Sequence, residues 1–187
     1  MIDGGIAAVR KAGRNRYGMQ SPRCVGRLST QRLAFAPSLV KQPSMTTRPG
    51  FAFSTRFRVR YAEIDGQKVV FNSRYLEYAD VAVTDFWDWT GIAEGVGAAW
   101  RESEFHVRRA EVDYLKPFVW GDTIQAFVRI EKIGNTSLTK RFELCHADTA
   151  ALHAVVMMTS VNVHLPTGKP TPLLAEVRTF LEGLPTE

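Results

Sequence analysis

The sequence is poor in cysteine and contains no long apolar run. Only Cys24 and Cys145 occur among its 187 residues, which is too few for a disulfide framework and favours a reducing compartment. Cys145 follows Leu144 in a strand-like stretch, so we interpret it as a small buried hydrophobic residue. No apolar stretch approaches the ~18 residues that cross a bilayer. We therefore expect no membrane span.

Several motifs of known chemistry are also missing. The glycines of residues 91–97 do not form a GxGxxG pattern after a strand, and no serine stands in a GxSxG elbow. The histidines lack the HxxxH or HxH spacing that is typical of metal ligands: His106, His146, His153 and His164. We therefore expect neither a metal ion nor a cofactor.

The net charge of +5 is unevenly distributed along the chain. Residues 1–50 contain nine Lys or Arg and one acidic residue, Asp3, for a net charge of +8. The remaining residues contain 15 basic and 18 acidic side chains, for a net charge of −3. A mildly acidic folded part predicts no nucleic-acid partner.

Residues 1–50 also differ from the rest in lacking sustained periodicity, so we expect a disordered or non-native basic extension followed by one domain over residues 51–187. Three interpretations of the extension remain open. It is an upstream extension of the reading frame with Met45 as the physiological start, an organellar transit peptide, or a functional basic tail. The expected location is the cytoplasm, or an organellar matrix if the segment is a transit peptide.

The periodicity after residue 50 predicts an α+β domain. Phe57, Val59 and Tyr61 alternate with arginines, as in a strand with one wet face. A long helix is predicted over residues 73–90, with Asn72 or Ser73 as N-cap and Gly91 as its stop. Its apolar stripe comprises Leu76, Ala79, Val83, Phe86 and Trp87, widened by Tyr75, Tyr78 and Ala82. Strands follow over residues 105–116, 123–133, 137–146 and 151–165, and a short helix begins at Pro172.

Two ordered motifs resemble a known family. The first is the stretch Arg60-Tyr61-Ala62-Glu63-Ile64-Asp65-Gly66-Gln67-Lys68-Val69-Val70-Phe71-Asn72-Ser73-Arg74-Tyr75-Leu76. The second is Ala110-Glu111-Val112-Asp113-Tyr114-Leu115-Lys116-Pro117, followed by Gly121-Asp122-Thr123. Together they resemble the 4-hydroxybenzoyl-CoA thioesterase branch of the hotdog superfamily, over roughly residues 53–182.

The resemblance implies a fold, an assembly and a site. The fold is a five-stranded antiparallel sheet wrapped around a long central helix. The assembly is a homodimer, or a dimer of dimers, with active sites between subunits. The family places its catalytic carboxylate where Asp65 stands, and its donor to the thioester oxygen is a backbone N–H at Asn72. This chain has Lys68 where the family usually has glycine.

The chemistry of thioester hydrolysis agrees with this placement. A carboxylate supplies the attacking oxygen as a nucleophile or by activating water, and a helix N-terminus stabilises the developing oxyanion. Spacing alone favours an ordinary turn or capping role for Asp65, whereas the resemblance favours the catalytic role. The neighbouring Glu63 is interpreted as a solvated charge.

Further residues are candidates for substrate binding. Tyr61, Val70 and Phe71 are expected to line the acyl pocket, although core packing explains them equally well. Ser137 resembles a position near the pantetheine arm in the family. Lys132, Lys140 and Arg141 could contact coenzyme A phosphates, but a solvated strand face explains them better.

These observations predict an acyl-CoA thioesterase. Two alternatives remain: a hotdog hydrolase that acts on acyl carrier protein, and a non-catalytic acyl-CoA-binding dimer. The preferred acyl group is left open.

Overall fold

The computed structural model describes residues 48–185. Residues 1–47 of the predicted basic extension lie outside the described residues. Five long strands form one sheet in the order β1-β3-β4-β5-β2, and every neighbouring pair is antiparallel. The strands are β1 (Phe53–Arg58), β2 (Ser103–Tyr114), β3 (Thr123–Ile133), β4 (Ser137–His146) and β5 (Leu152–His164). The two-residue strand β6 (Lys169–Pro170) pairs with β5.

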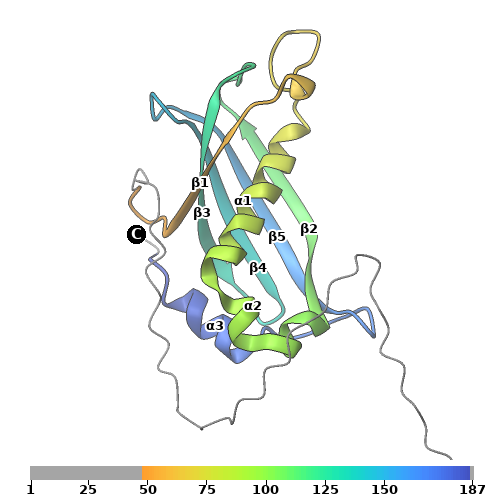
Figure 1. Cartoon of the computed structure of the whole chain (residues 1–187). Coiled ribbons are helices and arrows are strands. Elements are labelled where there is room, and N and C mark those ends of the chain that lie inside the picture. The colour runs from red at the N-terminus through yellow and green to blue at the C-terminus, as the bar shows by residue number, and fades with distance from the viewer. Residues whose placement is uncertain (1–47, 186–187) are drawn as a thin grey trace, which may run out of the picture. The chain divides into compact units, whose positions relative to one another are not determined.

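The long helix α1 (Arg74–Thr90) lies along the concave face of this curved sheet (Figure 1). The helix α2 (Ile92–Val96) and the 3-10 segment η2 (Gly97–Glu102) lead from α1 into β2, and α3 (Ala175–Glu182) closes the chain. A strand-wrapped central helix is the predicted hotdog architecture, and this part of the prediction is confirmed.

Helix α1 begins and ends close to the predicted residues. Ser73 occupies the N-cap position without a side-chain capping bond, and Gly91 ends the helix in the left-handed conformation, with a φ of 61°. The buried face runs through Tyr75, Tyr78, Ala79, Ala82 and Phe86. The sequence predicts Leu76 in this stripe, but its side chain is 37% exposed because the buried face runs through Tyr75, Tyr78 and Ala79 and Leu76 lies outside it.

Strand β1 is shorter at its carboxyl end than the alternating pattern predicts. Its pairing with β3 ends at Arg58, and residues Tyr61–Glu63 form the 3-10 turn η1. The N–H of Val59 donates to the Asp122 carbonyl, after which the chain leaves the sheet. Tyr61 is consequently 78% exposed and is not a strand residue.

The helix-facing side of the sheet forms the core with α1. Its fully buried side chains include Phe86 from the helix and Ile124, Leu138, Phe142 and Val156 from the strands. Cys145 is 1% exposed, as predicted for a small buried hydrophobic residue. Between residues 48 and 185, no helix has the length and apolar character required to cross a membrane.

Strand β2 is the edge of the sheet next to β5, and most of its side chains are exposed. The last helix, α3, begins at Ala175, three residues after the predicted start at Pro172. The Asn162 amide donates to the carbonyls of Thr171 and Pro172, at 3.2 and 3.1 Å, which holds this segment extended before the helix.

Candidate active site

Asp65 lies in a short loop that is closed by pairing between Ile64 and Val70. Its N–H donates to the Val69 carbonyl at 2.9 Å, and its Oδ1 accepts a bond from the Gln67 N–H at 2.7 Å. Lys68 has a φ of 65°, so the loop adopts at this position the left-handed conformation that glycine favours. The side chain of Asp65 is partly exposed, and its Oδ2 accepts no bond from the part of the chain that the structure describes.

Hydrogen bonds of Glu63 connect the Asp65 loop to the central helix α1. Its carbonyl accepts a bond from the Phe71 N–H at 2.9 Å, and its carboxylate accepts one from the Tyr78 hydroxyl at 2.8 Å. The backbone and guanidinium of Arg60 donate to the same carboxylate at 2.7 and 2.6 Å. The predicted solvated charge is therefore wrong, because Glu63 is 3% exposed.

The environment keeps Glu63 ionised despite its burial. Burial raises the pKa of this carboxyl, but the bonds from the Arg60 N–H, Tyr78 and the Arg60 guanidinium outweigh it and leave the pKa below its usual value. A sequence signal for this role existed, since the hydroxyl of a tyrosine on the buried helix face requires a hydrogen-bond partner.

Asn72 stands at the start of α1, seven residues after Asp65. The Tyr114 hydroxyl, from the end of β2, donates to the Asn72 carbonyl at 3.0 Å and ties the helix start to the sheet edge. Among residues 48–185 the Asn72 N–H has no hydrogen-bond acceptor. It is therefore free to donate to a group outside this part of the chain, as is common for N–H groups near a helix start.

A pocket of about 220 Å³ opens beside this helix start. Its walls come from the end of the Asp65 loop, the start of α1 and the segment after β2: Val70, Asn72, Tyr75, Tyr114, Leu115, Lys116 and Pro117. Val70 is held in the wall because its N–H donates to the Phe118 carbonyl at 2.9 Å. Tyr75 is held similarly, since its hydroxyl accepts the Phe118 N–H at 3.2 Å.

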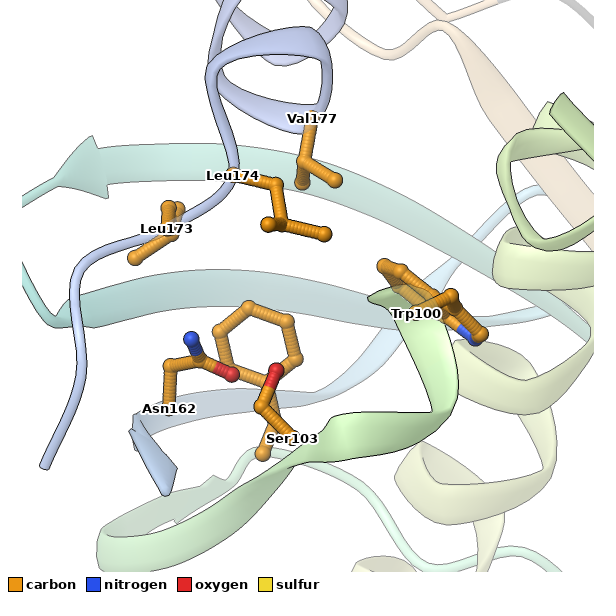
Figure 2. Close-up of a pocket in the computed structure, with 7 residues that line it drawn as sticks. Trp100, Ser103, Asn162, Leu173, Leu174 and Val177 are labelled. Atoms are coloured by element: carbon orange, nitrogen blue, oxygen red, sulfur yellow. The ribbon is translucent and has the colours of Figure 1, made fainter. Parts of the chain in front are cut away.

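Figure 2 shows a second and much smaller pocket, of about 10 Å³, between α3 and the sheet. Its wall is mainly apolar and includes Trp100, Leu174 and Val177. The one amide on it, that of Asn162, is already bonded to backbone carbonyls. This volume is at the lower limit for a single water, so the space does not suit a substrate.

The structure brings together some of the predicted site residues and separates others. Val70 and Asn72 line the pocket, whereas Asp65 lies outside the lining, in the loop that pairing between Ile64 and Val70 closes. Phe71 is half exposed, and Tyr61 contacts Trp120 outside the pocket. Ser137 lies at the opposite end of the sheet, roughly 23 Å along β4 from the level of the pocket.

The three suggested phosphate contacts differ in position. Lys132 is exposed on β3, and Arg141 donates to Glu143 at 2.9 Å. Lys140 points toward α1 and is 2% exposed, so a solvated strand face is wrong for this residue. Its Nζ donates to Ser160 Oγ at 3.2 Å and lies 5.5 Å from the Phe105 ring centroid.

His153 supports the pocket wall, although no sequence pattern marks this residue. Its Nδ1 lies 3.1 Å from the Pro117 carbonyl, and its own carbonyl accepts the N–H groups of Leu115 and Lys116. Its ring stacks on Phe118 at 4.3 Å. One wall of the pocket therefore depends on this side chain. No group of three metal-ligating side chains occurs within residues 48–185.

Comparisons with known proteins agree with this architecture. The sequence matches a family model described as the thioesterase-like superfamily over residues 59–181. The matched range contains the Asp65 loop, all of α1 and every residue that lines the larger pocket. No curated protein matches the sequence.

Solved structures of thioesterases share the fold. The 1,4-dihydroxy-2-naphthoyl-CoA thioesterase Slr0204 of Synechocystis is 22% identical, with a TM-score of 0.61 over 71% of this chain and 96% of that one. A predicted thioesterase of Bacillus stearothermophilus is 25% identical, with a TM-score of 0.60 over 70% and 93%. The DHNA-CoA thioesterase of Staphylococcus aureus is 18% identical, with a TM-score of 0.59 over 69% and 87%.

Proposed function

Because the chain belongs to the thioesterase-like superfamily, we propose that it hydrolyses acyl-CoA thioesters to the free acid and coenzyme A. Thioester hydrolysis, which the motifs predict, is confirmed at the level of the family. The coenzyme A ester as substrate is supported by two similar structures whose names specify CoA thioesters. The aromatic walls of the pocket, Tyr75 and Tyr114, suit an aryl or medium-chain acyl group.

The observation that carries the mechanism is the short closed loop that holds a carboxylate next to a helix start. Asp65 acts as nucleophile on the thioester carbonyl, or as general base on a water that attacks it. The Asn72 N–H stabilises the oxyanion that forms on the former carbonyl oxygen. In the general-base route the C–S bond then breaks, the free acid forms, and the proton taken from water passes to the sulfur, so that coenzyme A leaves as the thiol. In the nucleophile route the C–S bond breaks to leave a mixed anhydride on Asp65 and coenzyme A takes its proton from solvent; a water then hydrolyses the anhydride to the free acid and restores the carboxylate.

Two other functions make different predictions about the same pocket. A hydrolase of acyl carrier protein would release thiol from acylated carrier protein faster than from the matching acyl-CoA. A non-catalytic acyl-CoA-binding dimer would bind acyl-CoA without releasing thiol. Thiol release from a series of acyl-CoAs separates the three functions and identifies the preferred acyl group.

We also propose that the enzyme is a homodimer, alone or paired as a dimer of dimers, with the site between subunits. The edge strand β2 is 12 residues long and is paired only with β5 within residues 48–185. Antiparallel pairing of two β2 edges would place the sheet end that carries Ser137 in one protomer close to the pocket of the other protomer. That arrangement gives Ser137 a route to the pantetheine arm that one protomer does not offer.

The proposed location is the cytoplasm, or an organellar matrix if the basic segment is a transit peptide. The free thiol of Cys145 supports a reducing compartment.

The test of the mechanism is the substitution Asp65→Asn. Asparagine is nearly isosteric and keeps an acceptor for the Gln67 N–H, so the loop and substrate binding should survive. Turnover should fall by about 10²–10⁴-fold because a positioned carboxylate is lost. Asp65→Glu should also be slow, because an added methylene displaces the reacting oxygen by about 1 Å.

The matched control is Asp148→Asn, which changes an exposed turn aspartate that does not line the pocket and should keep wild-type kcat. Circular dichroism verifies that each variant is folded. A folded Asp65→Asn enzyme with kcat within threefold of wild type would remove Asp65 from the mechanism.

A further inference from the structure

Two large aromatic side chains next to the Asp65 loop are mostly exposed to solvent. Tyr61 is 78% exposed and Trp120 is 64% exposed. Their ring centroids are 5.9 Å apart and the rings meet edge to face, with an interplanar angle of 84°. Exposed rings gathered in one place are unusual on a monomeric surface and commonly mark a binding site.

Hydrogen bonds hold the two backbone turns that carry these rings. Tyr61 begins the 3-10 turn, where its carbonyl accepts the Ile64 N–H at 3.3 Å. Trp120 lies in a turn closed by Asp122, whose Oδ2 accepts the Val119 N–H at 2.9 Å. The next residue, Gly121, has a φ of 91°. An ordered backbone beneath both rings reduces the conformational entropy that is lost when a flat ligand stacks on them.

Guanidinium groups lie beside this pair. Arg58 Nε donates to the Gly121 carbonyl at 3.3 Å, directly after Trp120 in the chain. The terminal nitrogens of Arg58 donate to no group in residues 48–185. Arg60, which precedes Tyr61, is bonded to Glu63, yet its side chain is 74% exposed. An aromatic face flanked by guanidinium suits a purine ring that carries phosphates.

The pair is connected to the pocket by a short segment. Val119 pairs with Val69 at the end of the Asp65 loop, and Pro117 lines the pocket. Trp120 is three residues beyond Pro117, so the two backbones are at most about 10 Å apart. The pantetheine arm of coenzyme A separates the thioester from the nucleotide and can bend across this span.

We infer that Tyr61, Trp120 and Arg58 form a subsite for the adenine nucleotide end of coenzyme A. The purine stacks on the exposed indole, and Arg58 donates to the phosphates. This inference rests on the proposed function, since it names the part of the same substrate that remains outside the pocket. It also gives Tyr61 a role in binding the nucleotide rather than the acyl group.

The test compares acyl-CoA with the acyl-pantetheine that carries the same acyl group and lacks the nucleotide. Trp120→Ala should raise KM for acyl-CoA by about tenfold, the usual value of one aromatic–base stack. Its kcat, and its kinetics on acyl-pantetheine, should match wild type. Trp120→Phe should recover most of the loss. The control Val81→Ala removes an exposed apolar side chain of α1 that does not line the pocket, and it should leave the kinetics on both substrates unchanged.

Binding of adenosine 3′,5′-bisphosphate, measured by calorimetry, tests the subsite even if no acyl-CoA is hydrolysed. The affinity should fall in Trp120→Ala and in Arg58→Gln, and it should weaken with salt in the wild type. Equal effects of Trp120→Ala on both substrates, or none on acyl-CoA, would overturn the assignment. So would loss of dimerisation in Trp120→Ala by sedimentation, which would make the pair an interface between copies.

Discussion

Glu63 and Lys140 are both buried, but only Glu63 has enough partners to offset the loss of water. The Glu63 carboxylate accepts bonds from Arg60 and Tyr78. The Lys140 ammonium has Ser160 Oγ as its one hydrogen-bond acceptor in the described part of the chain, and Asp80 on α1 attracts it only at longer range. Burial therefore lowers the pKa of Lys140 to about 8.

Lys140→Met should stabilise the protein. The folded-state pKa lies below that of the unfolded lysine, so the unfolded state binds the proton more tightly and the penalty is complete below about pH 8. Methionine has a similar shape and no charge, so the free energy of unfolding at pH 7 should rise by about 3 kcal/mol. The gain should shrink as pH rises from 8 toward 10, as urea unfolding at both extremes would show.

The control for this substitution is Lys132→Met, on the exposed side of β3, which should change stability little and without a trend in pH. A Lys140→Met variant less stable than wild type at pH 7 would mean that the buried ammonium, with Ser160 and Asp80, is net stabilising.

At the scale of elements, the segment 115–118 links β2 to the turn before β3 and forms one wall of the pocket. It depends on His153, whose burial lowers its pKa below the ordinary histidine value, with a further contribution from His146 on β4. Asp122 and the bond to the Pro117 carbonyl act in the opposite direction, and Lys116 adds to the lowering. Folding therefore favours the neutral ring over the charged one.

This arrangement predicts acid sensitivity. Because the folded-state pKa of His153 is lowered, stability is complete above about pH 6.5 and falls as the pH drops below that value toward the folded-state pKa. The wild-type Tm should therefore decrease between pH 7 and pH 5. His153→Asn keeps an amide donor for the Pro117 carbonyl and cannot titrate, so its decrease should be smaller. His106→Asn changes an exposed histidine, and its Tm should depend on pH as in the wild type. An equal dependence of Tm on pH in all three proteins would contradict the role of His153.

The elements themselves were predictable where one periodic pattern decides the structure. Helix α1, its stop at Gly91 and four of the long strands follow from apolar spacing and turn residues.

The early end of β1 was not predictable, because the 3-10 turn at Tyr61–Glu63 depends on contacts of Glu63 with Tyr78 in another element. The burial of Lys140 and the exposure of Leu76 were not predictable either, because each depends on which side of its strand or helix packs against an element distant in sequence. Asp65 and Asn72 are proposed as site residues through the motif, and their roles stay predictions, whereas His153 and Trp120 become significant only through contacts distant in sequence.

At the scale of the whole molecule, β2 presents an unpaired edge and several half-exposed apolar side chains. Val107 in the middle of the strand is 57% exposed, and Tyr114 and Leu115 at its end are 52% and 55% exposed. The last two line the pocket. An open edge of this length invites pairing with another strand, and pairing with a second copy would cover the pocket from one side.

Val107→Asp should therefore convert a dimer into a monomer and lower activity with it. In a β2–β2 interface the new carboxylate would be buried without a partner, which disfavours association by several kcal/mol. Val81→Asp adds the same charge at an apolar residue that is 43% exposed on α1, outside the β2 edge, and it should remain dimeric and active. Sedimentation equilibrium at micromolar concentration, with thiol release measured at the same concentration, distinguishes the two variants. A wild-type protein that is monomeric and fully active under these conditions would show that one protomer completes its own site, and the β2 interface would have to be abandoned.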